Sequence, residues 1–390
     1  MAALRGDWNY PTRIRFGPGR IAELAESCRS VGIARPLLVT DRGLAPTDMI
    51  AWAVAGLVGA GLDVAVFSDF GGDPAGEDVA EGCAALRSHG ADGVIAFGGG
   101  SALDAGKAIA LHAFQARPLW DFEDVGDNFA RADASKILPV IAVPTTAGTG
   151  SEVGRASVIK DRAASVKRII FHPLMLPKVV LADPELTVGL PAALTAAVGM
   201  DALSHNLEAF FAPGYHPLAR GIAVEGARLV KDWLETAVAE PANIEARSNM
   251  LAASEAGATA FQRGLGAVHA LAHPLGAVYG VHHGLLNAVL MPYVLAANRP
   301  AIDADAAYLA RCLGVGAVAG DLIAWVCRLR ANVGIANTLA DVGVPASEVG
   351  RIARMATEDP SAATNPVAFA QGDYARILEQ ALAGDLPKAA

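Results

Sequence analysis

The sequence is poor in cysteine, in charge and in basic clusters, and each shortage argues against a kind of protein. Its 390 residues include four cysteines, no two of which form a Cys-x-x-Cys pair. A disulfide framework or a thiolate metal site is therefore not expected, and a reducing compartment fits this usage. Charged residues make up 18% of the chain, the formal net charge is −9, and no basic run occurs. We expect neither a nucleic-acid partner nor binding to an anionic membrane.

Long apolar runs are also missing. No stretch of about 18 apolar residues is present, so no transmembrane helix is predicted. The first residues, MAALRGDWNYPTRIRF, lack the apolar centre of a signal peptide, and we expect a cytoplasmic protein. What the chain does have is 53% hydrophobic residues, a globular composition that allows large cores and two domains.

Strands and helices are predicted to alternate in the first half of the chain. Periodicity predicts strands over residues 12–16, 34–41, 63–67, 93–97 and 139–143, and helices over residues 20–31, 47–60, 77–89 and 104–114. This order indicates a parallel sheet with helices on both faces. After Asp183-Pro184 almost every segment has helical periodicity. We therefore expect an α/β, Rossmann-like dinucleotide-binding domain over residues 1–185 and an all-α domain over residues 186–390, with roughly seven to nine helices.

A glycine-rich turn marks the predicted nucleotide site. Gly98-Gly99-Gly100-Ser101 follows a buried strand and precedes a helix. Glycines there admit a pyrophosphate, and the free N–H groups of the helix start bind its charge. Asp104 and Lys107 lie in the first turns of that helix. A tight turn with a helix cap is the alternative interpretation of these glycines.

Two further features at the carboxyl edge of the predicted sheet favour a dinucleotide. The loop PTTAGTGSE over residues 144–152 is rich in hydroxyls and glycines, as expected for a phosphate or nicotinamide-ribose site. Asp41 ends a strand, where a carboxylate suits an adenosine ribose and repels a 2′-phosphate. NAD is therefore favoured over NADP, although Arg42 could neutralise such a phosphate. Asp41 could instead be a turn or cap residue.

An aspartate and several histidines suggest a metal site in the second half. Asp201 and His205 lie four residues apart, so both side chains share one helix face; taken alone, this spacing favours a hydrogen-bonded pair on the helix surface. His269 and His273 repeat this spacing before a predicted bend at Pro274–Gly276. One carboxylate and two or three imidazoles, without thiolates, suit Fe²⁺, Zn²⁺, Co²⁺ or Mn²⁺ and leave a position open for substrate. His282 and His283 follow the bend, and only one of these adjacent residues is expected to bind the metal.

These motifs together resemble the iron-containing, group III alcohol dehydrogenases. The resemblance rests on GGGSxxDxxK (98–107), PTTAGTGSE (144–152), DPELTxGLP (183–191), GMDALSHxxEAF (199–210) and HxxxHPLGAxYxxxHG (269–284), in this order along most of the chain. It implies a dinucleotide-binding domain, a helical domain, and a metal in the cleft between them. It also implies a homodimer that pairs through the N-terminal strand.

The resemblance assigns roles to individual residues. The metal ligands are expected to be Asp201, His205, His269 and His283, with Fe²⁺ favoured and Zn²⁺ as the alternative. The catalytic histidine near the nicotinamide would be His273. Cofactor contacts are expected at Asp41, Gly98, Gly99, Gly100, Ser101, Asp104, Thr145, Thr146, Thr149 and Lys167.

The predicted reaction is hydride transfer between a primary alcohol, or a hydroxy acid, and the nicotinamide, with the alkoxide on the divalent metal. The partner is then a small alcohol or aldehyde. Apolar cleft candidates suggest a short or medium chain: Phe171, Leu275, Val278 and Phe261. Arg155 could bind a substrate carboxylate or form a surface or interdomain salt bridge, and the roles of His172 and His282 stay open.

Two kinds of alternative to an alcohol dehydrogenase are considered: other enzymes with the same fold, and a protein without catalytic activity. A glycerol-dehydrogenase-like zinc enzyme and a dehydroquinate-synthase-like metal and NAD lyase have the same architecture, but the lyase would need several basic residues near its ligands. A non-catalytic metal- or nucleotide-binding protein is the alternative from another class. The sequence also departs from the family where Phe171-His172-Pro173 is bulkier than expected, and where Asn365-Pro366-Val367 has valine in place of arginine.

Overall fold

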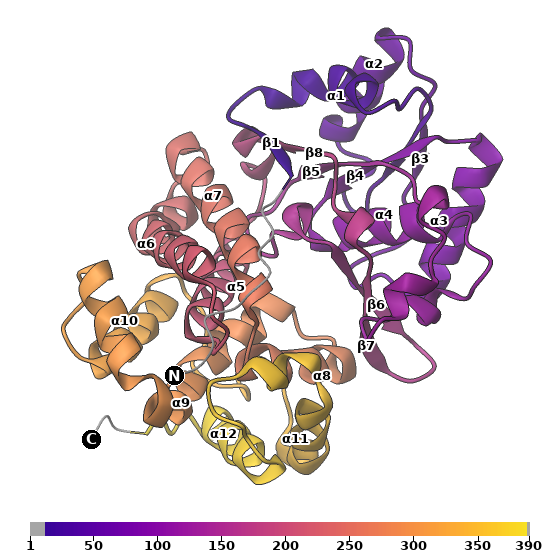
Figure 1. Cartoon of the computed structure of the whole chain (residues 1–390). Coiled ribbons are helices and arrows are strands. Elements are labelled where there is room, and N and C mark those ends of the chain that lie inside the picture. Colours follow the sequence, from indigo (N-terminus) through magenta and orange to yellow (C-terminus); the bar gives the residue numbers. More distant parts are fainter. Residues whose placement is uncertain (1–11, 388–390) are drawn as a thin grey trace. The chain divides into compact units, whose positions relative to one another are not determined.

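The computed structural model of the chain describes residues 12–387, which divide into two compact units (Figure 1). The α/β unit contains the described part of residues 10–146 together with residues 150–189. The helical unit contains residues 147–149 and the described part of residues 190–390. Residues 1–11 and 388–390 of the two predicted domains lie outside the described residues, and the predicted boundary between residues 185 and 186 stays a prediction.

The α/β unit is built on a six-stranded parallel sheet with the strand order β1-β8-β5-β4-β2-β3. Its strands are β1 (Arg13–Phe16), β2 (Pro36–Val39), β3 (Ala65–Phe67), β4 (Gly93–Gly98), β5 (Val140–Pro144) and β8 (Val179–Ala182). The four central strands are buried along their whole length, as expected where helices cover both faces of a parallel sheet. The predicted fold class is confirmed.

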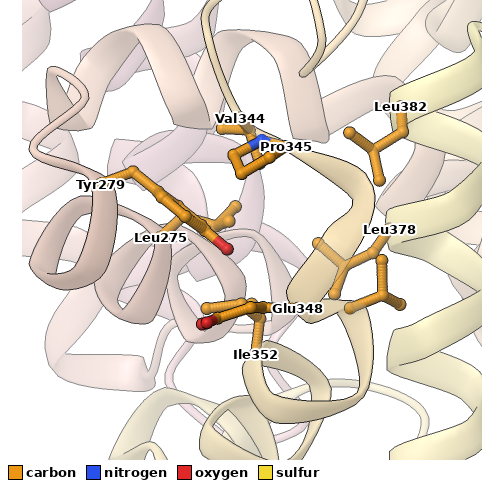
Figure 2. Close-up of a pocket in the computed structure, with 9 residues that line it drawn as sticks. Leu275, Tyr279, Val344, Pro345, Glu348, Ile352, Leu378 and Leu382 are labelled. Atoms are coloured by element: carbon orange, nitrogen blue, oxygen red, sulfur yellow. The ribbon is translucent and has the colours of Figure 1, made fainter.

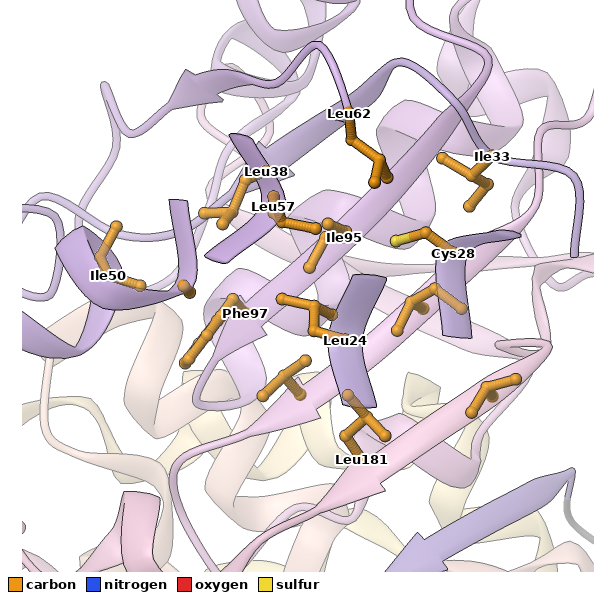
Figure 3. Close-up of a cluster of buried hydrophobic side chains, with 14 residues drawn as sticks. Leu24, Cys28, Ile33, Leu38, Ile50, Leu57, Leu62, Ile95, Phe97 and Leu181 are labelled. Atoms are coloured by element: carbon orange, nitrogen blue, oxygen red, sulfur yellow. The ribbon is translucent and has the colours of Figure 1, made fainter. Parts of the chain in front are cut away.

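Four helices pack on this sheet: α1 (Leu24–Ser30), α2 (Asp48–Gly59), α3 (Gly76–His89) and α4 (Gly100–His112). Side chains of α1 and α2 form an apolar core with alternate residues of the strands, among them Leu38, Ile95 and Leu181 (Figure 3). On the opposite face α4 lies close to β4, because a Cβ on Gly106 would be only 2.6 Å from the Cβ of Ala96. This close approach leaves no room for a side chain at Gly106.

Three strands were not predicted from the sequence. β6 (Ala156–Asp161) and β7 (Val166–Phe171) form an antiparallel hairpin, and the four-residue β8 completes the large sheet between β1 and β5. The place of β8 depends on pairing with strands distant in sequence, which local periodicity does not report. Short 3₁₀ helices fill several connections: Arg20–Glu23, Leu119–Phe122, Asn128–Arg131, Ala134–Lys136, Ser151–Val153, Pro173–Met175, Pro184–Thr187, Phe261–Arg263, Ala346–Glu348 and Pro360–Thr364.

The helical unit contains α5 (Ala192–Phe211), α6 (Pro217–Ala239), α7 (Ile244–Ala260), α8 (Ala267–Tyr279), α9 (His283–Leu313), α10 (Ala319–Asn332), α11 (Val349–Glu358) and α12 (Gln371–Ala383). Helix α5 is its central element and packs against α6, α7 and α9. Pro274 lies inside α8, so the helix does not end at Pro274–Gly276; an interior proline removes one helix hydrogen bond, and the bend predicted there stays a prediction. No helix within residues 12–387 is long and apolar enough to cross a membrane.

The close approach of α4 to β4 predicts opposite effects for two glycine substitutions. Gly106→Ala is expected to lower the free energy of unfolding by about 1–3 kcal/mol, because its methyl group would overlap Ala96. The matched control is Gly56→Ala on the exposed face of α2, where an added Cβ meets nothing within 4 Å. This control should stabilise by about 0.5–1 kcal/mol. Denaturant unfolding measures both, and equal effects would contradict the packing described.

Candidate metal and cofactor sites

Helix α5 holds the first two predicted ligands inside the helical unit. Asp201 and His205 lie one turn apart and are 2% and 5% exposed. The ring of His205 packs against Phe261, with 5.3 Å between ring centroids. Its Nδ1 lies 3.3 Å from the carbonyl oxygen of Gly148. Donation from Nδ1–H to that oxygen leaves Nε2 of His205 as the free acceptor, which is the form that binds a metal.

Helix α8 adds the third ligand, His269, which is fully buried. Its Nδ1 lies 2.6 Å from Oε2 of Glu208 on α5. Burial lowers the pKa of His269 well below its usual value and raises the pKa of Glu208 to about 7. The imidazole is therefore neutral near pH 7. Glu208 was not predicted as a site residue, although its position three residues after His205 puts it on a neighbouring part of the same helix face.

The predicted ligands converge. The donor atoms of Asp201, His205 and His269 all lie within 4.8 Å of one another. His283, the first residue of α9, is outside this compact group, but its Nε2 lies 3.7 Å from Oδ1 of Asp201. Its ring centroid is 5.3 Å from that of His269. The structure thus gathers the four residues, three of them tightly; their role as ligands stays a prediction.

Asn287 lies among these donor atoms. Its Nδ2 is 2.7 Å from Oδ1 of Asp201, 3.1 Å from Nε2 of His283 and 3.3 Å from Nε2 of His269. An amide NH2 group has two hydrogens to donate, so the three atoms that face it outnumber its donors. A buried carboxylate and unprotonated imidazole nitrogens are a set of metal ligands that fits Fe²⁺ or Zn²⁺. Asn287 was not predicted, although it lies one helical turn after His283.

His273 lies one turn after His269 on α8 and stacks on His283, with 5.4 Å between ring centroids. Its Nδ1 is 2.8 Å from Oδ2 of Asp359. Burial acts to raise the pKa of Asp359, but the charge of His273 and the hydrogen bonds from His273 and Ser361 outweigh it and the pKa is lowered. Asp359 thus favours the Nδ1–H form of His273 and leaves Nε2 to take up a proton. His282, in contrast, is an exposed residue at the start of α9.

The α/β unit carries the predicted cofactor residues where β4 and β5 end. Gly98 has a φ of 149°, and a Cβ there would lie 2.7 Å from the Cβ of Ala102, so the turn requires glycine. Gly99 is the N-cap residue of α4 and has no side chain to occupy the first N–H groups, which remain available for a phosphate. Thr145 donates its N–H to Gly98, and Thr146 lies beside Gly99. Helix α4 begins at Gly100, earlier than predicted, so Ser101 lies in its first turn.

Asp41 follows β2 and faces the glycine turn. Its Oδ1 accepts hydrogen bonds from the N–H groups of Gly43 and Leu44, at 2.8 and 3.1 Å. Its Oδ2 would lie 3.6 Å from a Cβ on Gly98. The turn role that the sequence left open is therefore present, and one carboxylate oxygen lies next to the predicted pyrophosphate site.

Three other predicted cofactor residues have less direct positions. Asp104 accepts a hydrogen bond from Ser151 and pairs with the buried Lys107 at 3.4 Å. Lys167 on β7 pairs with Asp73 at 2.6 Å. Thr149 belongs to the segment that groups with the helical unit. The contacts of Asp104, Lys167 and Thr149 with a cofactor stay predictions.

Glu152, at the end of the predicted nicotinamide loop, is buried, and neither carboxylate oxygen has a hydrogen-bond partner among the described residues. Burial raises the pKa of Glu152 to about 7, although Lys107 acts in the opposite direction. The sequence placed this residue in the loop motif but gave no reason to expect an unpaired carboxylate there.

The apolar residues predicted to contact the substrate do not all line one pocket. Leu275 lines a small pocket with Tyr279, Ile352 and Leu378 (Figure 2), and none of the predicted metal ligands is among the residues that line it. In the α/β unit the guanidinium of half-buried Arg155 lies 5.5 Å from the ring centroid of Phe171. His172 uses Nδ1 to accept the N–H of Leu174, which is a structural role.

Comparison with known proteins covers nearly the whole chain. Residues 11–184 match the family described as iron-containing alcohol dehydrogenase, and residues 195–382 match the C-terminal domain of the Fe-containing alcohol dehydrogenase family. The 4-hydroxybutyrate dehydrogenase of Cupriavidus necator is 40% identical over 386 residues, 96% of this chain and 99% of that protein. The NAD-dependent methanol dehydrogenase of Bacillus methanolicus is 36% identical, over 94% and 97% of the two chains. A crystal structure of a 1,3-propanediol oxidoreductase superimposes with a TM-score of 0.92 at 35% identity, over 97% and 100%.

Burial of the Glu152 carboxylate predicts a pH-dependent stability. Its pKa is raised from 4.5 to about 7 in the folded protein. The contribution of the protonated Glu152 side chain to the free energy of unfolding is therefore fully present below about pH 4.5 and is lost as pH rises through about 7. Between pH 5 and pH 8 the unmodified protein should lose on the order of 2 kcal/mol more free energy of unfolding than Glu152→Gln. Denaturant unfolding at the two pH values measures this difference. Parallel losses in the two proteins would show that Glu152 is ionised without penalty.

Proposed function

The chain belongs to the iron-containing alcohol dehydrogenase family and is an NAD-dependent oxidoreductase, and we propose that it oxidises short primary alcohols that carry a second polar group, such as ω-hydroxy acids or diols. The observation that carries the metal-dependent chemistry is the buried convergence of Asp201, His205 and His269 within 4.8 Å. The substrate class is supported by relatives named for 4-hydroxybutyrate and 1,3-propanediol. Arg155 is the proposed partner of a substrate carboxylate.

The residues of the site divide the chemistry between them. A divalent metal, when bound, supplies the Lewis acid that lowers the pKa of a hydroxyl group; we propose Fe²⁺, held by Asp201, His205, His269 and His283. His273 accepts the released proton at Nε2, while Asp359 holds the proton on Nδ1. The first N–H groups of α4 hold the pyrophosphate of NAD, and the carboxylate of Asp41 favours NAD over NADP. We also propose a cytoplasmic homodimer.

Metal depletion tests this function. The protein would be purified without oxygen, stripped with a chelator, and supplied with Fe²⁺, Zn²⁺ or no metal. NADH and NADPH formation would be followed with methanol, 1,3-propanediol and 4-hydroxybutyrate. Activity restored by Fe²⁺ with NAD, and highest with the bifunctional substrates, is the expected result. Activity that survives complete metal removal would contradict the proposal, and metal binding without activity on any alcohol would favour the lyase-like alternative.

Two substitutions separate metal binding from proton transfer. Asp201→Ala should lose bound metal and activity together, because it removes the buried carboxylate of the donor set. His273→Ala should keep its metal while turnover falls by about 100-fold or more. Elemental analysis of each purified variant and its rate of NADH formation measure the two effects. Loss of metal from His273→Ala would place His273 among the ligands instead.

A further inference from the structure

We infer that Glu208 is a positioning residue for metal binding: its carboxylate fixes the tautomer of His269 and joins α5 to α8, the helices that carry three of the four proposed ligands. The inference rests on the proposed metal-dependent function. Glu208 is on α5, one turn beyond His205, and its carboxylate is 9% exposed. It accepts hydrogen bonds from Gly266 N at 2.9 Å, from Val268 N at 2.7 Å and from His269 Nδ1 at 2.6 Å.

The contact with His269 decides which ring nitrogen can bind a cation. A neutral imidazole has one N–H and one acceptor nitrogen. Glu208 accepts two backbone hydrogen bonds and faces Nδ1 as an acceptor, which places the ring proton on Nδ1 and leaves the lone pair of Nε2 free. Nε2 lies 3.3 Å from the amide nitrogen of Asn287, a contact that is compatible with an acceptor at Nε2. The two contacts, on opposite sides of the ring, select the same tautomer.

The other two hydrogen bonds place the backbone of His269. Gly266 and Val268 lie at the start of α8, where helix N–H groups have no partner within the helix. Glu208 satisfies two of them from α5, the helix that also carries Asp201 and His205. One carboxylate on α5 thus binds the start of α8 and orients the imidazole of His269. Outer groups of this kind typically contribute 10- to 100-fold to metal affinity.

A matched control separates ligand orientation from helix capping. Asn365 accepts a hydrogen bond from Ala267 N at 3.0 Å, so it caps the same helix start. Its other partners are Asn298 and Val367 rather than a histidine. Asn365→Ala removes a cap from α8 and leaves the Glu208–His269 contact in place. Glu208→Gln keeps the shape of the side chain but can present an amide N–H to Nδ1, which would move the ring proton to Nε2.

The test measures Co²⁺ and Zn²⁺ affinity of the metal-depleted full chain by chelator competition, together with the visible spectrum of the Co²⁺ form and the thermal midpoint without metal. Glu208→Gln should bind metal about 10- to 100-fold more weakly and change the Co²⁺ spectrum. Asn365→Ala should lower the midpoint but keep the affinity within about 3-fold and the spectrum unchanged. If Glu208→Gln fails to fold, Glu208→Asp, which keeps the acceptor but shortens its reach, carries the same comparison.

Two results would overturn the inference. Unchanged affinity and spectrum in the Glu208 variant would show that His269 keeps its orientation without the carboxylate. An equal loss of affinity in Asn365→Ala would show that Glu208 acts only as a helix cap. Failure of the proposed function has a different signature, because the unmodified chain would then bind no stoichiometric metal at all.

Discussion

Burial of the Asp201 carboxylate inside the helical unit is the constraint around which this structure is organised. A carboxylate taken out of water is costly unless a cation or several donors face it. Asp201 faces the amide of Asn287 and the imidazoles of His269 and His283, which are neutral or weak partners. The cluster therefore has more acceptors than donors at its centre. A divalent cation resolves that imbalance.

The α/β unit meets a negative ligand by different means. Here the turn between β4 and α4 offers backbone N–H groups, and glycine is needed because the φ of Gly98 and the closeness of Ala102 leave no room for a side chain. Asp41 lies beside this turn, and Lys107 is buried next to Asp104. One unit thus gathers acceptors for a cation, and the other exposes donors for a phosphate. A dehydrogenase that uses both a metal and a dinucleotide requires both kinds of site.

Local patterns predicted much of this arrangement. Helical spacing paired Asp201 with His205 and His269 with His273, and the family resemblance chose the expected ligands among them. Buried strands followed by glycine indicated the turn at Gly98. The sequence could not show that Glu208 bonds to a histidine 61 residues away, or that Asp359 meets His273 across 86 residues, because these contacts arise only from tertiary packing. Tertiary packing also gives β8 its place in the sheet, between β1 and β5.

The proposed metal site at Asp201, His205, His269 and His283 is tested by locating the metal in a crystal. Crystals of the protein grown with Fe²⁺ without oxygen would be measured on both sides of the iron absorption edge, and an anomalous difference map would be calculated. We expect one peak per chain, at about 2.0–2.3 Å from ligand atoms of Asp201, His205 and His269, with His283 completing the set. A peak elsewhere, or full activity in crystals and solution without any peak at these residues, would contradict it.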